Sequence, residues 1–138
     1  MDWLKTFHDD HKDVLILLAK LEGNVMDLKA GLDTPNTFVE FREFGDIIKN
    51  VLLPHFKQEE TGIYKKVGEY GSDERTFIDN MLQEHEALYS LFAQYLKAVD
   101  DLDKGKLIEI GATLGSVLTH HITKEEDTLP HMVKPNIE

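Results

Sequence analysis

Apolar residues recur every three or four positions along most of this 138-residue chain, which is the spacing of one buried face of an α-helix. The pattern predicts helices at about 7–30, 36–70, 72–102 and 106–129. No stretch keeps the two-residue alternation that is typical of a strand. Four long helices with short connections favour an all-α fold, an antiparallel up-down four-helix bundle in which residues 1–138 form a single domain.

Turn-forming residues separate the predicted helices, at 31–35, 71–73 and 103–105. Pro54 lies inside the second stretch and should kink it or divide it into two helices. The last helix is expected to stop at Pro130. The residues expected to cap helix starts are Thr6 with Asp9, and Ser72 or Asp73.

The apolar face of each predicted helix supplies the candidate core. These faces comprise Leu4, Phe7, Leu15, Leu18, Val25 and Leu28; Phe41, Phe44, Ile48, Val51, Leu52 and Ile63; Phe77, Met81, Leu88, Phe92, Tyr95 and Val99; and Ile110, Leu114, Val117, Leu118 and Leu129. Four histidines are in register with them, one in each helix: His11, His55, His85 and His121. A single histidine on an apolar face usually finds a hydrogen-bond partner within the core. One histidine in each of four helices instead indicates a shared site.

Two of these histidines are followed four residues later by a glutamate: His55 by Glu59, and His121 by Glu125. Residues four apart lie on the same helical face, so both members of each pair should project into the bundle interior. The next residues, Glu60 and Glu126, are rotated by roughly 100° and are expected to face solvent.

Buried carboxylates and imidazoles cost several kcal/mol each unless they are neutralised or paired. Ion pairs among them would offset part of this cost, and a metal ion would offset more of it because both donor types become ligands. Six donors are too many for one tetrahedral zinc. If the two glutamates bridge a pair of metals, each metal receives two imidazoles and two carboxylate oxygens. Such donors suit iron, and also manganese, zinc or copper.

The composition excludes or disfavours several kinds of site and partner. The absence of cysteine excludes disulfides and thiolate sites, and 26 acidic against 15 basic residues disfavour binding to nucleic acid or an anionic membrane. The longest apolar run, at 14–19, is too short to span a membrane, and the start does not have the pattern of a signal peptide. We therefore expect a cytoplasmic protein. Of three further histidines, His8 could swing toward the site but is expected at a solvated helix start, His120 is expected to point away from the site, and His131 is expected on the surface.

The ordered set of His11, His55-x-x-x-Glu59, His85 and His121-x-x-x-Glu125 resembles the hemerythrin-like (HHE cation-binding) domains over essentially the whole chain. The resemblance implies a four-helix bundle with a non-haem di-iron centre, bridged by two carboxylates and by an oxo, hydroxo or related oxygen species. It further implies that His11 and His55 bind one iron, that His85 and His121 bind the other, and that Glu59 and Glu125 bridge them. Such domains bind dioxygen reversibly, sense oxygen, nitric oxide or iron, or serve in iron storage and repair.

One position departs from the family. Oxygen-carrying hemerythrins have a His-x-x-x-His pair in the third helix, whereas Met81 and Tyr89 occupy the positions four before and four after His85. Water, a carboxylate such as Glu84 or Glu86, or nothing would then replace one imidazole. This departure disfavours simple oxygen carriage and favours peroxide, nitric oxide or redox chemistry.

Three functions follow. The leading hypothesis is a di-iron protein that binds dioxygen or a related small diatomic ligand, as a carrier, store or sensor. The alternative is a di-iron redox enzyme, an oxidase or peroxidase, or an iron-repair protein. The third is a metal-free bundle that acts as an interaction domain. Ferritin-type oxidases are disfavoured, because they use Glu-x-x-His and no histidine in this chain has a glutamate three positions before it.

Overall fold

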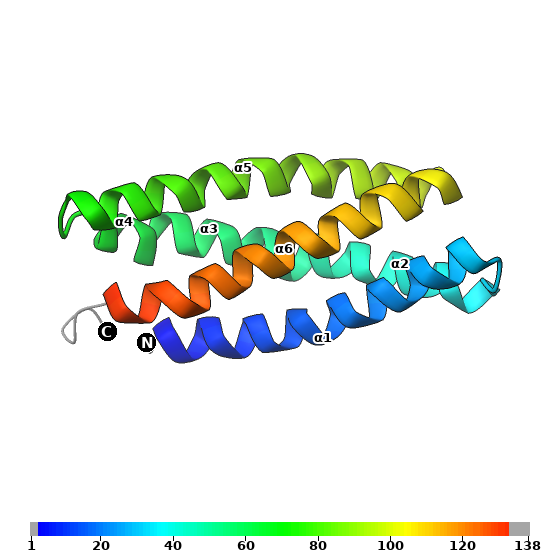
Figure 1. Cartoon of the computed structure of the whole chain (residues 1–138), viewed down its shortest axis with the longest axis horizontal. Coiled ribbons are helices and arrows are strands. Elements are labelled where there is room, and N and C mark those ends of the chain that lie inside the picture. The colour runs from blue at the N-terminus through cyan, green and yellow to red at the C-terminus, as the bar shows by residue number, and fades with distance from the viewer. Residues whose placement is uncertain (1–2, 133–138) are drawn as a thin grey trace.

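The computed structural model describes residues 3–132, with side chains from Asp9 onward, and this part of the chain is helical apart from short connections. The elements are α1 (Trp3–Ala30), α2 (Pro35–Ile47), a π-helical turn (Ile48–Leu52), α3 (Leu53–Thr61), α4 (Ile63–Gly68), α5 (Ser72–Asp100) and α6 (Lys104–Met132). These elements form the helical runs α1, α2 to α4, α5 and α6. Figure 1 shows the runs packed side by side. The predicted all-α class and helical bundle are confirmed.

The helical runs of the bundle contact one another in a closed ring. α1 packs against α6 and α2, and α5 packs against α6, α4 and α2. α1 begins and α6 ends at the same end of the molecule (Figure 1). The early residues of α1 therefore lie beside the late residues of α6, which brings His11 close to Glu125.

The π-helical turn explains how the chain passes Pro54 without a break. The Leu53 N–H donates to the Ile48 carbonyl five residues earlier, and Pro54, which has no N–H to donate, stands in the first turn of α3. The wider turn shifts the buried face, so that Ile48 and Leu52 are buried while Val51 is exposed. The expectation that Val51 belongs to the core was wrong for this reason.

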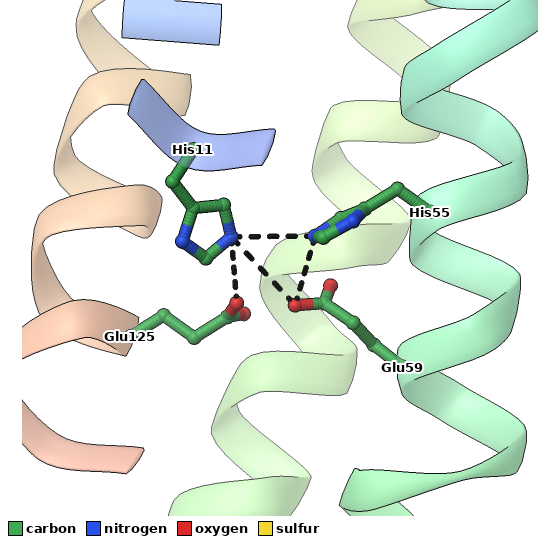
Figure 2. Close-up of side chains that lie close together, drawn as sticks. All are labelled: His11, His55, Glu59 and Glu125. Atoms are coloured by element: carbon green, nitrogen blue, oxygen red, sulfur yellow. Dashed lines mark hydrogen bonds and ion pairs between the residues drawn. The ribbon is translucent and has the colours of Figure 1, made fainter. Parts of the chain in front are cut away.

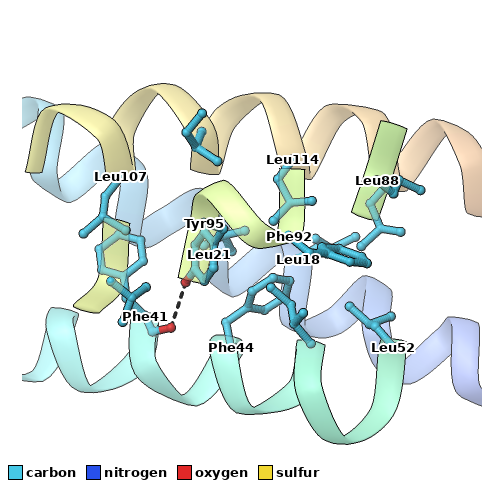
Figure 3. Close-up of a cluster of buried hydrophobic side chains, with 14 of the residues drawn as sticks. Leu18, Leu21, Phe41, Phe44, Leu52, Leu88, Phe92, Tyr95, Leu107 and Leu114 are labelled. Carbon is cyan, nitrogen blue, oxygen red and sulfur yellow. Dashed lines mark hydrogen bonds between the residues drawn. The ribbon is translucent and has the colours of Figure 1, made fainter. Parts of the chain in front are cut away.

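Two apolar clusters flank the site histidines and glutamates along the bundle. The larger one contains Phe41, Phe44, Phe92 and Tyr95, and the Tyr95 hydroxyl donates a 2.8 Å hydrogen bond to the Phe41 carbonyl (Figure 3). The smaller one comprises Ile63, Tyr64, Val67, Phe77, Ile78, Met81 and Leu129. Along α5 and α6, the predicted site residues lie between members of the two clusters, so apolar side chains close the site from both ends.

Several predicted helix ends were wrong. α1 begins at Trp3, so Thr6 lies inside it, and Gly71 rather than Ser72 or Asp73 occupies the N-cap of α5. α6 continues through Pro130 to Met132, because a proline so close to the end disturbs only the last turn. A further break separates α3 from α4 within the predicted second helix.

Most of the predicted core is buried, with Leu15 as a further exception. Apart from Asn24, the buried residues of α1 among the described side chains follow a regular seven-residue pattern of His11, Val14, Leu18, Leu21, Val25 and Leu28. Leu15 lies one position off this pattern and is exposed. The predictions for the side chains of Leu4, Phe7 and His8 lie outside the described side chains. No helix among the described residues has both the length and the apolar character needed to cross a bilayer.

Candidate metal centre

The six predicted ligands converge in the bundle interior from four helices. Each is at most 6% exposed: His11, His55, Glu59, His85, His121 and Glu125. Their donor atoms form two groups, and within each group the atoms lie within 4.8 Å of one another. The first group is His11, His55, Glu59 and Glu125, and the second is Glu59, His85, His121 and Glu125. His120 and His131 are exposed, as predicted.

Figure 2 shows the first group, with all four side chains directed toward one point. The His11 Nε2 atom lies 3.1 Å from Glu125 Oε1, and the His55 Nε2 atom lies 3.2 Å from Glu59 Oε2. The two Nε2 atoms are 3.3 Å apart. Two nitrogen and two oxygen donors therefore surround one position.

The second group uses the other oxygen of each glutamate. Glu59 Oε1 lies 3.3 Å from His85 Nε2, and Glu125 Oε2 lies 3.2 Å from His121 Nε2. Each carboxylate thus offers one oxygen to each group. This is the arrangement of two bridging carboxylates between two metal positions.

The hydrogen bonds of these buried donors indicate whether a metal fits the site. Four buried atoms have no hydrogen-bond partner among the described residues: Glu59 Oε1 and Oε2, His121 Nε2 and Glu125 Oε1. Leaving such groups unpaired in an apolar interior costs several kcal/mol. Cations at the two positions would engage all four atoms, so the residues fit a pair of metal ions.

The comparison with protein families agrees with this geometry. The family model of the hemerythrin HHE cation-binding domain matches residues 2–133. The chain belongs to this family. The predicted resemblance is therefore confirmed, and family membership together with the buried histidine–glutamate cluster identifies a metal-binding protein. Comparison with curated proteins and with solved structures gave no match.

Each of the four site histidines of this hemerythrin domain donates its Nδ1–H to a second carboxylate. The Nδ1 bonds run from His11 to Glu126 at 2.8 Å, from His55 to Asp10 at 3.1 Å, from His85 to Glu60 at 2.7 Å and from His121 to Glu84 at 2.8 Å. Such bonds direct Nε2 of each ring toward the donor groups and hold the ring in place. All four imidazoles are thus oriented by an acidic side chain.

Two of these outer carboxylates correct the sequence analysis. Glu60 and Glu126 were expected to face solvent, but both are half-buried and accept hydrogen bonds from histidines of neighbouring helices. The rotation of roughly 100° that removes them from the inner site carries them to the adjacent helix rather than to water. Tyr89 also donates a 2.7 Å hydrogen bond to Glu60, and Lys124 donates one of 2.9 Å to Glu84.

Neither predicted acidic substitute for the missing third-helix histidine belongs to the two donor groups in this structure. Glu84 lies on the outer side of His121, and Glu86 is exposed. The side chain that reaches this part of the site is Tyr64 of α4. Its hydroxyl donates a hydrogen bond to Glu125 Oε2 and lies 3.3 Å from His85 Nε2.

Sequence reasoning missed Tyr64 because helical spacing points it elsewhere. Tyr64 follows Glu59 by five residues, which in an unbroken helix would rotate it by roughly 140° from that carboxylate. The backbone at Gly62 instead leaves the helical region, with φ −109° and ψ −97°, and α4 begins at Ile63. This break redirects Tyr64 into the site.

The electrostatics of the metal-free cluster are strongly interdependent. Burial and the charge of Glu125 raise the pKa of Glu59 well above its usual range. Burial also opposes ionisation of Glu125, but the close polar contacts with Glu59, His11 and His121 outweigh it and hold the pKa of Glu125 well below its usual range. Burial lowers the pKa of His85 to about 4. Glu59 therefore stays protonated beside an ionised Glu125, and a bound cation would take the place of that proton.

Proposed function

We propose that this chain is a non-haem di-iron protein that binds dioxygen or a related small diatomic ligand, as a carrier, store or sensor. The observation that carries the proposal is the sharing of Glu59 and Glu125 between the two donor groups, one oxygen to each. Imidazole and carboxylate are donors that iron accepts. The six side chains leave positions on each metal for an oxygen-derived bridge and an external ligand.

The residues of the chain would hold and isolate this centre. His11 and His55 would bind one iron, His85 and His121 the other, and the two shared glutamates would bridge them. When bound, the iron pair supplies the electrons and the open coordination position that dioxygen needs. The Phe56 ring stacks on His85 at a centroid distance of 3.9 Å, and the apolar clusters exclude bulk water from both ends.

We also propose the up-and-down antiparallel topology for the four helical runs. Its support is the position of the start of α1 beside the end of α6, together with connections of only a few residues. In this arrangement, each run would contribute to the site from one of the four sides of the bundle.

The test is a metal analysis combined with visible spectra before and after exposure to air. We expect about two irons per chain after expression in iron-replete cells, and a reversible spectral change when the reduced protein meets oxygen. Glu59→Gln should lose the metal, whereas Glu22→Gln, at an exposed position of α1, should keep it. A wild-type chain without iron would contradict the proposal.

A redox enzyme is the second candidate, favoured by oxidisable phenols beside the site. Tyr64 contacts Glu125 and His85, and Tyr89 donates a hydrogen bond to Glu60. Stopped-flow mixing of the reduced protein with oxygen distinguishes the two functions. A stable oxygenated spectrum supports ligand binding, whereas rapid conversion to ferric iron with consumption of added peroxide supports an oxidase or peroxidase.

A further inference from the structure

The hydroxyl of Tyr64 lies inside the second donor group rather than at its edge. It contacts Glu125 Oε2 and lies 3.3 Å from His85 Nε2, and both atoms belong to that group. The tyrosine is 1% exposed, so its hydroxyl is buried together with these donors. An ion held by His85 and Glu125 would therefore lie within bonding reach of the phenol oxygen.

We propose that Tyr64 is a protein ligand of the iron held by His85 and His121, bound through its phenolate oxygen. The proposal rests on the proposed di-iron function and deepens it. When the ion binds, the O–H bond of Tyr64 breaks, an oxygen–iron bond forms, and the proton is released to solvent. Metal binding releases protons from donors in this way because ligands must be deprotonated.

The other side chains on this side of the site are occupied elsewhere. Glu84 accepts hydrogen bonds from His121 Nδ1 and Lys124, and Tyr89 donates to Glu60. Met81, four residues before His85, is buried in the smaller apolar cluster. Among the described residues considered for the position of the missing imidazole, Tyr64 is thus the one that reaches it with an oxygen.

The simpler alternative is that Tyr64 only orients Glu125 by a hydrogen bond. In a bridged centre, however, Glu125 Oε2 would share its electron density with the cation and would be a weaker acceptor, so that the cation and the phenol proton would compete for it. Oxygen donors with negative charge suit ferric iron, and tyrosine is an established ligand of iron in haem proteins. Ligation resolves this conflict, because the phenol oxygen turns from a proton donor into an electron-pair donor.

With Tyr64 as a ligand, the two irons would have different sets of protein donors. The iron of the second group would receive two imidazoles, two carboxylate oxygens and one phenolate. Among the described side chains, four would reach the iron of the first group. The phenolate would thus take the coordination position that the missing third-helix imidazole leaves on the second iron.

The experiment uses the iron-loaded full chain in its ferric state. A phenolate ligand gives a phenolate-to-iron charge-transfer band in the visible spectrum, and excitation into it enhances tyrosine ring modes in resonance Raman spectra. We expect Tyr64→Phe to lose both signals while retaining about two irons per chain. Tyr95→Phe is the matched control and should keep both, since Tyr95 is equally buried but bonds to the Phe41 carbonyl in the larger cluster.

Each outcome decides the proposal. Two irons with an unchanged band in Tyr64→Phe would overturn the tyrosine ligand and leave the di-iron function standing. Absence of iron from the wild-type chain would overturn both. A wild-type chain with two irons and no phenolate band would likewise overturn the tyrosine ligand. If Tyr64→Phe does not fold or does not retain iron, incorporation of ring-fluorinated tyrosine into the wild-type chain replaces it. The band must then shift in energy, and a band that does not move overturns the ligand assignment.

Discussion

The Nδ1 atom of His85 donates a 2.7 Å hydrogen bond to Glu60, while its Nε2 atom lies 3.3 Å from Glu59. Two adjacent glutamates of α3 thus contact both ring nitrogens of a histidine of α5. The same relationship recurs between α6 and α1. There His11 Nε2 lies 3.1 Å from Glu125, and His11 Nδ1 lies 2.8 Å from Glu126. The Glu-Glu pair of each motif thus supplies one inner and one outer carboxylate.

The outer glutamates should matter for metal affinity. Glu60→Gln and Glu126→Gln keep the side-chain size but remove the charge that makes His85 and His11 better donors. We expect each change to weaken iron binding by about 10- to 100-fold with the helical content unchanged. Competition with a chelator measures the affinity. Glu86→Gln, at an exposed position next to His85, should leave it unchanged, and equal effects of all three variants would contradict this role.

The sharing of Glu59 predicts different metal stoichiometries for two variants. Because Glu59 belongs to both donor groups, Glu59→Gln should lose both metals. His11 belongs to the first group alone, so His11→Gln should retain the metal of the second group. Metal analysis after gel filtration should give about two metals for the wild type, about one for His11→Gln and less than one for Glu59→Gln. Equal loss in both variants would argue against two separate positions.

Removal of the metal should destabilise the fold. A ligand at 1,000 times its dissociation constant stabilises the folded state by about 4 kcal/mol, which corresponds to a fall in Tm of roughly 10 °C on chelation for a chain of this length. The double variant Glu59→Met and Glu125→Met replaces both buried acids by apolar side chains of similar length. It should not respond to chelator and should be at least as stable as the metal-free wild type. A wild type that is indifferent to chelator would favour a metal-free interaction domain.

The metal-free protein should lose stability in mild acid through His85. Burial lowers its pKa from 6.5 to about 4, so between these pH values the unfolded chain binds a proton that the folded chain does not. Stability therefore falls as the pH falls through this window, by about 2 kcal/mol between pH 7 and pH 5. Denaturant unfolding at both pH values checks this.

His85→Gln provides the comparison, since it lacks the titrating group. Burial lowers the pKa values of His11 and His121, but hydrogen bonds and the charge of Glu125 outweigh it and raise them. These two histidines therefore make both the wild type and the variant more stable as the pH falls. The loss between pH 7 and pH 5 should be about 2 kcal/mol larger in the wild type than in the variant. Equal losses would show that His85 is not held neutral.

Two glycines of α6 should respond oppositely to alanine. A Cβ atom at Gly111 would lie 2.8 Å from Val25 Cγ2, so Gly111→Ala should force α1 and α6 apart and destabilise the protein by about 1–2 kcal/mol. A Cβ atom at Gly115 meets no described atom within 4 Å, and Gly115→Ala should stabilise the helix by about 0.5–1 kcal/mol. Thermal unfolding of the two variants measures both effects, and the same sign in both would refute the close approach at Gly111.

The sequence by itself determined the helical class and the six inward donors, because a helical face repeats every 3.6 residues and each donor is in register with its own apolar stripe. His11, His55, Glu59, His85, His121 and Glu125 could be selected in this way without knowledge of how the helices pack. The family followed from the same six residues, since their order and separations along the chain are readable directly.

Only the tertiary structure decided what lies around these donors. Periodicity says which side of a helix is buried, but not which neighbouring helix a flanking side chain reaches. Glu60 and Glu126 were therefore expected to face solvent, yet they accept hydrogen bonds from His85 and His11 of neighbouring helices. The π-helical turn before Pro54 and the break at Gly62 change the phase of the buried face, and no regular spacing encodes such changes. The position of Tyr64 in the site depends on that break, so it became visible only once the chain was folded.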